Sequence, residues 1–446
     1  MMGKSMKCSG ADFPGLKSRE LSSRAQKVFP GGITRSTVER DPSPCYISKG
    51  SGAYLTDVDG QKFLDLSNNF TTLIHGHAYP PVIEAVSRVL QDGTCFSNPT
   101  AHEVALAELL VSRIPAIDKI RFVNTGTEAV MFAIKAARAF TGRPGVAKFE
   151  GSYHGSYDWA EVGQVGNPST WGDADSPVPV PAYEGMPTSV ADDCLILPFN
   201  DPDQARQQIA ASADRLACIL LDPMPSCGGL NHPDPEFIAA VVETAREYGV
   251  LVICDEVLNL RQGYQGASAR YGIEPDLITA GKIIGGGFPI GAVGGSSRVM
   301  SVFDGSNGPA KVGQAGTFSA NPVSMVAGYA CMEALDETAF ARLDSMGDRL
   351  RSGLSDVISR RNVHYVVSGA ASLFRIHNKA TLPENYREAH TTPDEAKNMS
   401  DMKRYFLSQN IILPIGRAAC LSTAMTDADI DGIVEVFEKF LNLEPQ

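Results

Sequence analysis

The stretch VLVICDEV, residues 250–257, opens with a continuous apolar run, 250–254, that is followed by two acidic residues and Val257. Such a run is typical of a strand that is buried on both faces of a sheet. The segment before it, 234–249, predicts a helix, because it opens on Asp-Pro-Glu, which supplies an N-cap, a proline at N1 and an acid in the first turn. Similar buried strands are predicted at ACILLDPM, 217–224, and at DLITAGK, 276–282. Strand, helix and strand at this spacing predict a parallel, doubly wound α/β sheet.

Two chemically distinctive side chains fall at the carboxyl ends of these strands. Asp255 closes one strand and Lys282 closes the next, and ligands of such sheets bind at this edge, so we expect both to face one crevice. A lysine after a strand is usually solvated, with its stem lying on apolar surface. In ITAGKIIGGGF, 278–288, however, the neighbours are small or apolar and include no acid that could pair with the amine. Burial lowers the pKa of an amine and keeps it neutral, as a nucleophile must be.

A candidate phosphate site lies earlier, in IRFVNTGTEAVMFAIKAARAFTG, residues 120–142. The segment predicts a short strand, a tight turn and a helix whose free N–H groups and dipole favour an anion, with Thr125, Gly126 and Thr127 as contacts. Each feature by itself is more often a cap, a turn former or a solvated side chain. An anion cradle, a carboxylate and an amine on strand ends of one sheet together fit pyridoxal 5′-phosphate (PLP), which carries a phosphate, a ring nitrogen and an aldehyde.

Other phosphate and metal motifs do not fit the sequence. Ile283 follows Lys282 where a P-loop requires serine or threonine, and Ile290 stands where the dinucleotide pattern has its third glycine. His75 and His77 have no partner cluster, and HExxH does not occur. The sequence therefore predicts no metal site.

Composition bounds the class of protein. The chain has 446 residues, of which 43% are hydrophobic, enough for a large core and more than one compact unit. A net charge of −12 argues against nucleic acid or an anionic membrane as the main partner. Nine cysteines without a CxxC pair predict reduced thiols, and the start, 1–13, lacks the apolar core of a signal peptide. Since no apolar window could span a bilayer, we expect a cytoplasmic protein.

The chain resembles the class III (ω-type) aminotransferases of PLP fold type I. The motifs LVICDEV, DLITAGKIIGGGFPIGAVGG, NTGTEAV, GSYHG and GTFSANP carry the resemblance and run in family order from about residue 28 to 437. The similarity is greatest to the branch of glutamate-1-semialdehyde aminomutase and the β-amino-acid aminotransferases. It implies a large PLP-binding domain at 75–325, with a mainly parallel sheet flanked by helices. It also implies a smaller α+β domain from both chain ends, 1–74 and 326–446.

The resemblance implies a role for each candidate residue. Lys282 would be the Schiff-base lysine and the acid–base that moves the proton between Cα and C4′. Asp255 would hold the proton on the pyridine nitrogen, while Tyr153 would stack on one face of the ring and Val257 would pack on the other. Thr317 would reach the phosphate of the neighbouring subunit, which implies an obligate homodimer with shared active sites. The remaining cofactor contacts would be the phosphate-binding residues Thr125, Gly126 and Thr127.

Two places depart from the family pattern. The strand before the aspartate strand ends in Asp222-Pro223, where Glu-Pro is usual. The following loop, MPSCGG, lacks the Asn or Gln found near the phenolic oxygen of the cofactor, which leaves Ser226 or Cys227 as candidates. The glycines at 285–287 would let the backbone pass close to the cofactor.

The substrate residues point in two directions. Arg35 has the position of the arginine that binds a substrate carboxylate in β-amino-acid aminotransferases. The aminomutase carries its arginine three residues later, where this chain has Val38. Arg417 lies near a second carboxylate-binding arginine, and Phe70 would form a pocket wall. The long segment 155–187, rich in Gly, Pro and Ser, favours the aminomutase, in which a loop here gates the site.

The resemblance therefore implies a PLP-dependent aminotransferase, which moves the amino group of an α- or β-amino acid to a keto acid in ping-pong half-reactions. The alternative is a glutamate-1-semialdehyde-type 2,1-aminomutase, which would use the same Lys282 but retain its intermediate behind the 155–187 loop. A noncatalytic relative, such as a regulator, is disfavoured because the lysine and the aspartate are intact and no DNA-binding extension is present.

Overall fold

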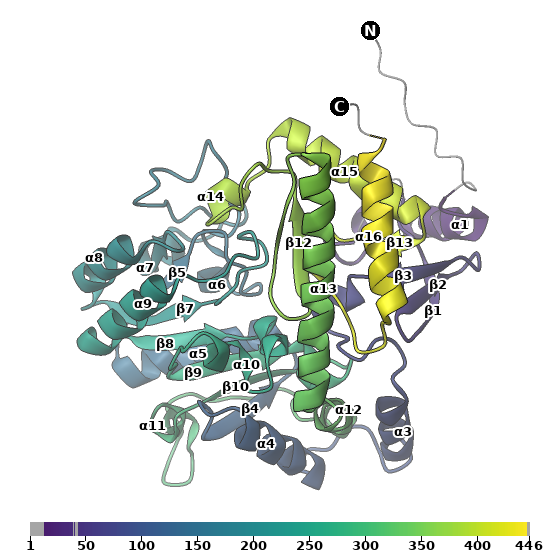
Figure 1. Cartoon of the computed structure of the whole chain (residues 1–446). Coiled ribbons are helices and arrows are strands. Elements are labelled where there is room, and N and C mark those ends of the chain that lie inside the picture. Colours follow the sequence, from purple (N-terminus) through teal and green to yellow (C-terminus); the bar gives the residue numbers. More distant parts are fainter. Residues whose placement is uncertain (1–12, 39, 41–42, 444–446) are drawn as a thin grey trace.

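A seven-stranded sheet forms the centre of the protein, described here from a computed structural model for residues 13–38, 40 and 43–443 (Figure 1). Its strands are β4 (Lys119–Val123), β5 (Gly145–Phe149), β6 (Cys194–Leu197), β7 (Leu216–Leu221), β8 (Leu251–Asp255), β9 (Leu277–Gly281) and β10 (Gly291–Gly295). The order is β4-β10-β9-β8-β7-β5-β6, and only β10 runs antiparallel to its neighbours. The predicted α/β class with a mainly parallel sheet is confirmed.

Helices cover both faces of this sheet. They are α4 (Ala101–Arg113), α5 (Gly126–Thr141), α8 (Pro202–Ser212), α9 (Pro235–Tyr248) and α12 (Pro322–Glu333). Leu251 and Ile253 of β8 share a core with α5, whereas Val252 and Cys254 share a second core with the other four helices. Each such aliphatic side chain contributes about 1.5–3 kcal/mol when fully buried. The Asp234 carboxylate caps α9, which confirms the helix predicted before β8.

Segments from both chain ends form a second unit, the terminal lobe. Its strands are β1 (Ile47–Ser51), β2 (Tyr54–Asp57), β3 (Lys62–Asp65), β11 (Val366–Ser368), β12 (Leu373–His377), β13 (Ile411–Ile412) and β14 (Ala419–Cys420). Its long helices are α13 (Glu337–Arg361), α15 (Pro393–Ser408) and α16 (Asp427–Leu441). Because β13 pairs in parallel with β3, the two ends of the chain share one sheet. The domain boundaries predicted at 74/75 and 325/326 stay a proposal.

Short elements connect these layers. The α-helical ones are α1 (Leu16–Ala25), α2 (Asn68–Thr71), α3 (Pro80–Val89), α6 (Asp158–Glu161), α7 (Thr188–Asp193), α10 (Gly266–Arg270), α11 (Ser297–Met300) and α14 (Tyr386–Ala389). The 3-10 turns are η1 (Pro30–Gly32), η2 (Asn259–Gln262), η3 (Lys282–Gly285) and η4 (Ser301–Phe303). Of these, α2, η2 and η3 adjoin the candidate site.

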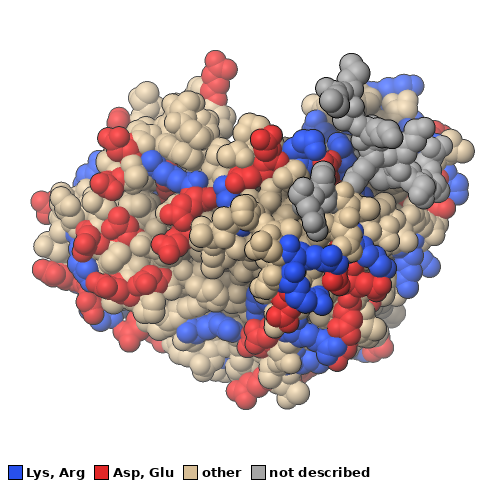
Figure 2. Space-filling model, turned by 45° about the horizontal axis from the view of Figure 1, so that its top comes forward, with Lys and Arg blue, Asp and Glu red and all other residues tan. Residues whose placement is uncertain are grey.

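The surface mixes charges of both signs. On the face shown in Figure 2, acidic side chains predominate on the left, and basic ones gather beside acidic ones on the right. None of the described helices combines the length and apolar composition needed to cross a membrane. All eight cysteines within the described residues are free thiols. Cys8 and most of the chain start considered for a signal peptide lie outside the described residues.

Candidate active site

Asp255 lies buried at the carboxyl end of β8, with both carboxylate oxygens in hydrogen bonds. Oδ1 accepts from the Thr279 hydroxyl at 2.8 Å and from the Val257 amide at 3.1 Å. Oδ2 lies 2.7 Å from Nδ1 of His154. Burial raises the pKa of Asp255, but the hydrogen bond from His154, with those from Val257 and Thr279, holds it below the usual value. The carboxylate therefore stays ionised, and it retains free lone pairs for a further donor.

His154 is the main partner of Asp255 and was missed in the sequence. The imidazole is buried, and burial lowers its pKa, so the neutral ring donates from Nδ1 to the carboxylate. Its Nε2 is buried without a hydrogen-bond partner among the described residues. A single histidine on a loop has no periodicity or spacing that marks it, and only its place beside Tyr153 in GSYHG was a signal.

Lys282 follows β9 directly, as predicted, and its backbone is left-handed with φ of 49°. A non-glycine residue in this region costs on the order of 1 kcal/mol, and such outliers cluster at functional sites. Burial lowers the pKa of the Lys282 amine. The charges of Asp255 and Asp222 oppose that shift, while that of Arg261 reinforces it. Within the described chain, Nζ forms no hydrogen bond or ion pair, so the amine is free to react.

The N-terminus of α5 faces the same edge of the sheet. The Thr125 hydroxyl caps the helix, so one predicted phosphate contact also has a structural task. A side chain at Gly126 would bring its Cβ within 2.7 Å of Val257, so glycine lets the first turn lie against the end of β8. The Thr127 hydroxyl accepts from the Ser156 amide at 3.2 Å. The first amides of α5 have no preceding carbonyl to bond, so they point out of the helix towards this crevice.

The loop after β5 carries Tyr153 and His154 to this edge. Lys148 of β5 fixes this loop, because its Nζ donates to the carbonyl of Ser152 at 3.0 Å and to that of Ala160 at 2.5 Å. Burial lowers the pKa of Lys148 to about 7. Tyr153 is 49% exposed, on the open side of the crevice. Its stacking on the cofactor stays a prediction, as does the packing of Val257 on the other ring face.

Asp222, the departure from the family pattern, is a buried acid at the end of β7. Its Oδ1 accepts from the Met224 amide at 2.9 Å and from the Asn259 side-chain amide. Burial, together with the charge of Asp255, raises the pKa of Asp222 to about 8. At pH 7 the carboxyl is therefore mostly protonated, and the crevice holds one ionised carboxylate rather than two.

We expect Asp222→Asn to keep the fold and to stabilise the protein relative to wild type as the pH rises. Between the ordinary pKa of 3.8 and the folded value of about 8, folded Asp222 binds more protons than unfolded Asp222. The free energy of unfolding therefore falls with rising pH through this window, by up to about 1.4 kcal/mol per pH unit, and the amide removes that dependence. Urea midpoints of the cofactor-free proteins at pH 5, 7 and 9 measure it. Equal pH slopes for both proteins would contradict the assignment.

The three predicted substrate residues meet at one ring. The guanidinium carbons of Arg35 and Arg417 lie 5.5 and 5.4 Å from the centre of the Phe70 ring. Arg35 also donates from Nη1 to the Asn69 side-chain oxygen at 3.3 Å. Segments separated by most of the chain are thus brought to one aromatic ring, with two cations of the kind that binds carboxylates beside it.

The turn that bears Phe70 is left-handed over four successive residues. Asn68, Asn69, Phe70 and Thr71 have φ between 45° and 69°, a conformation that costs L-residues roughly 1–2 kcal/mol each. The cost is offset by neighbours that fix the turn at both ends. Asp65 accepts from the Asn68 amide at 3.1 Å, and Asn68 donates from Nδ2 to the carbonyl of Asp65. Strain held by such support is typical of functional sites.

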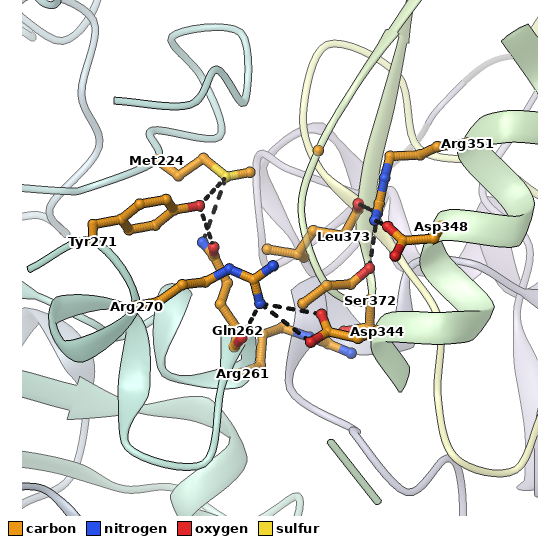
Figure 3. A network of polar contacts seen from close by, with 12 residues as sticks. Met224, Arg261, Gln262, Arg270, Tyr271, Asp344, Asp348, Arg351, Ser372 and Leu373 are labelled. Atoms are coloured by element: carbon orange, nitrogen blue, oxygen red, sulfur yellow. Dashed lines mark hydrogen bonds and ion pairs between the residues drawn. The ribbon is translucent and has the colours of Figure 1, made fainter. Parts of the chain in front are cut away.

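Arg261 fixes the other end of this turn and was also missed in the sequence. It is fully buried and donates to the carbonyls of Thr71 at 2.8 Å and Leu421 at 2.6 Å, and to the Ser372 hydroxyl at 3.0 Å. Figure 3 shows Arg261 beside Ser372, with Arg270 of α10 reaching Asp344 of α13. The segment that follows Asp255 therefore joins the large sheet to both parts of the terminal lobe.

Two predicted contacts have other tasks in the structure. The Ser226 hydroxyl accepts from the Ala418 amide at 2.8 Å, which ties the loop after β7 to the strand that follows Arg417. At Gly286 a Cβ would lie 2.4 Å from the carbonyl of Ala327, while the predicted approach of the 285–287 backbone to the cofactor stays a prediction. That glycine lets η3 pack on α12.

Thr317 lies on an exposed segment. Its carbonyl accepts from the Cys95 thiol at 3.3 Å. The aromatic neighbours Phe96 and Phe318 are 51% and 61% exposed. The contact of Thr317 with a neighbouring subunit stays a prediction.

Comparison with known proteins gives concordant matches. A profile of the family described as aminotransferase class-III matches residues 36–397. Glutamate-1-semialdehyde 2,1-aminomutase of Methanothermobacter thermautotrophicus is 35% identical, over 96% of this chain and 99% of the relative. An omega-transaminase from Sphaerobacter thermophilus is 45% identical with a TM-score of 0.93, over 96% of this chain and 98% of that chain. A beta-phenylalanine aminotransferase from Variovorax paradoxus is 31% identical with a TM-score of 0.85, over 96% of this chain and 94% of that chain.

Proposed function

Since this chain belongs to the class-III aminotransferase family, we propose that it moves an amino group from an α- or β-amino acid to a keto acid by ping-pong transamination. Its fold is PLP fold type I, and PLP is the cofactor. The observation that carries the proposal is the convergence of Arg35 and Arg417 on Phe70. A transaminase must bind two carboxylate substrates in turn, and two arginines on one wall suit that task.

The residues at the sheet edge fit this cofactor. PLP, when bound, supplies an aldehyde for the amino group and a protonated ring that takes up the electrons of the Cα–H bond. The ionised Asp255 would hold the proton on the ring nitrogen, with His154 and Thr279 keeping the carboxylate in place. Gly126 and Thr127 at the start of α5 would bind the phosphate through amides and a hydroxyl.

Lys282 would supply the base of the reaction. Burial lowers the pKa of its amine and so favours the neutral form, which can take the proton from the substrate Cα. Since Nζ has no partner within the described chain, no hydrogen bond has to break before it reacts. The same amine in its protonated form would return the proton, so one residue would act as base and then as acid.

A glutamate-1-semialdehyde-type 2,1-aminomutase is the alternative. The names of the curated relatives favour it, including that of the 35% identical Methanothermobacter protein. The position of Arg35, and the 45% identity to an omega-transaminase, favour transamination. The beta-phenylalanine aminotransferase among the solved relatives supports a β-amino donor.

Dependence on an added acceptor separates the two activities. The purified protein is given α- or β-amino acids with pyruvate or 2-oxoglutarate, and the formation of alanine or glutamate is followed. Product that requires the keto acid supports transamination. Isomerisation of glutamate 1-semialdehyde at a comparable rate without a keto acid would overturn it in favour of the aminomutase.

We expect Arg35→Ala to raise KM for carboxylated donors by about tenfold or more and to leave simple amines nearly unchanged. A lost charge-assisted hydrogen bond matters only where an anion was present to receive it. Steady-state kinetics with a β-amino acid and with its decarboxylated amine measure the difference. Arg246→Ala is the control, because Arg246 is an exposed arginine of α9 that pairs with Glu274. Equal losses for acids and amines would discard Arg35 as the carboxylate anchor.

We also propose a cytoplasmic homodimer with shared active sites. The free thiols support a reducing compartment. Phe96 and Phe318, exposed on two segments joined by the Cys95–Thr317 hydrogen bond, suit burial against a second copy. Thr317 would then reach the partner's phosphate site, as the family resemblance implies.

A further inference from the structure

Helix α14 lies apart from the long helices of the terminal lobe, beside the loops above the large sheet (Figure 1). The connection between β12 and α15 carries it there. Asn200, directly after β6, anchors this connection by donating from Nδ2 to the carbonyl of Glu384 at 3.1 Å. The terminal lobe is therefore tied to the segment after β6, and α14 also contacts the loop that follows β5.

Arg387 of α14 bonds entirely to that loop. Nε and Nη2 donate to the two oxygens of the buried Glu150 carboxylate at 2.8 and 3.1 Å. Nη1 donates to the carbonyl of Gly172 at 2.8 Å, and Nη2 to those of Trp171 at 3.0 Å and Asp173 at 2.8 Å. The guanidinium also lies over the Trp171 ring, 5.0 Å from its centre. One side chain thus joins the end of β5 to three consecutive carbonyls further along the loop.

Tyr386 fits against the same loop. A Cβ at Gly151 would lie 2.0 Å from the Tyr386 ring, so only glycine leaves room for the ring there. The Tyr386 hydroxyl donates to the carbonyl of Gly166 at 2.6 Å. Tyr386 therefore contacts the loop at both Gly151 and Gly166.

The loop between these anchors is the one that reaches the candidate active site. On the sheet side Lys148 holds the carbonyls of Ser152 and Ala160, and His154 is bound to Asp255. On the outer side α14 contacts the loop at Glu150 and Gly151, and again at Gly166 and 171–173. The positions of Tyr153 and His154 are therefore set from two sides.

We propose that Arg387 is a positioning residue, which fastens the 150–173 loop to the terminal lobe and so sets where Tyr153 and His154 stand against the cofactor. The inference rests on the cofactor contacts proposed above for the site. The Glu150 side chain is only 7% exposed, so removing Arg387 leaves a buried carboxylate without its guanidinium partner and frees the 171–173 stretch from it. The loop has to shift to hydrate this carboxylate, because an unpaired buried charge is costly.

The two tryptophans of the chain give a direct reporter of this loop. They are Trp159 and Trp171, so Trp159→Phe leaves Trp171, under the Arg387 guanidinium, as the only indole emitter. In this background we expect Arg387→Met to increase the quenching of Trp171 by acrylamide. We also expect amide hydrogen exchange to rise about tenfold or more in 163–173 and in 150–155.

Arg349→Met is the matched control. Arg349 binds both oxygens of Asp431 between α13 and α16, so it is a bidentate arginine that does not touch the loop. Arg349→Met should leave the quenching of Trp171, and the amide exchange of 163–173 and 150–155, unchanged.

The circular dichroism of bound PLP tests positioning rather than mere tethering, because it reports the asymmetric surroundings of the ring. Holo Arg387→Met should retain PLP but lose most of this signal, and holo Arg349→Met should keep it. Faster exchange in 163–173, with unchanged exchange in 150–155 or an unchanged dichroism band, would overturn the positioning role. Unchanged exchange throughout would overturn it as well. None of these measurements uses turnover, so an incorrect donor class would contradict the proposed transamination and leave this test intact.

Arg387→Lys provides a second variant in case Arg387→Met does not fold. Lysine keeps a charge for Glu150 but lacks the planar set of donors needed to reach three carbonyls at once. Arg387→Lys should increase amide exchange and weaken the dichroism of bound PLP, as Arg387→Met does. Wild-type values for both measurements would overturn the proposal.

Discussion

Lys282→Ala is expected to abolish turnover while the protein still folds and binds PLP weakly. The variant lacks the amine at the carboxyl edge of β9, and with it the proposed attachment point of the cofactor and the proposed base of the reaction. We expect the rate to fall by about 10⁴-fold or more. The visible absorbance band of the lysine-bound cofactor should disappear, while the thermal midpoint of the cofactor-free protein should stay the same or rise, because a partly buried amine is removed.

Lys282→Arg is the informative control for this experiment. Arginine keeps a cation beside Asp255 but cannot become neutral in a protein. It should therefore be as inactive as alanine, which separates the need for a neutral amine from the need for charge. Near-normal turnover in either variant would remove Lys282 from its role and, with it, the whole assignment.

The backbone of the fold and the centre of the site were predictable because their signals are local. The β8 strand is a continuous apolar run, α9 carries its own cap at Asp234, and Lys282 stands at a strand end among small residues. Since the carboxyl ends of parallel strands share one edge, the order of these elements was enough to bring Asp255 and Lys282 together.

The residues that support the site were not predictable, because each acts across the fold. His154 bonds to a carboxylate 101 residues away, and Arg261 reaches carbonyls 160 and 190 residues away. A buried polar residue in a single sequence looks the same as a solvated one, since burial depends on which segments pack against it. Lys148 was missed for the same reason, as its partners are backbone carbonyls that any residue would offer.

The left-handed turn at Asn68–Thr71 was invisible for a different reason. Asparagine tolerates positive φ, but phenylalanine and threonine do not favour it, so local preference argues against the turn that forms. The fixed neighbours on either side, Asp65 and Arg261, decide the backbone there. Conflict between local preference and the folded structure is expected where function sets the geometry.

The charge balance of the crevice leads to the second large effect, that of Asp255→Asn. Wild-type Asp255 is ionised because hydrogen bonds from His154, Val257 and Thr279 outweigh its burial. The nearby Asp222 is mostly protonated at pH 7, since burial and Asp255 raise its pKa to about 8, and so it supplies little negative charge for the ring nitrogen. Asp255 is thus the one ionised carboxylate in a position to hold the pyridine proton.

Asparagine at 255 should lower kcat/KM by at least two orders of magnitude, which corresponds to about 3 kcal/mol of barrier. An amide cannot stabilise a positive ring nitrogen, so the electron sink weakens. The amide also fits its neighbours poorly: an Nδ2 turned towards the Val257 amide sets donor against donor. Turned towards His154 instead, it forces the imidazole proton onto Nε2, which is buried without a partner among the described residues.

Steady-state kinetics and the titration of bound PLP by ultraviolet–visible absorbance test this effect of Asp255→Asn, with Asp255→Glu as the variant that keeps the charge. A kcat/KM equal to that of wild type in Asp255→Asn would show that the ring proton is held by another group.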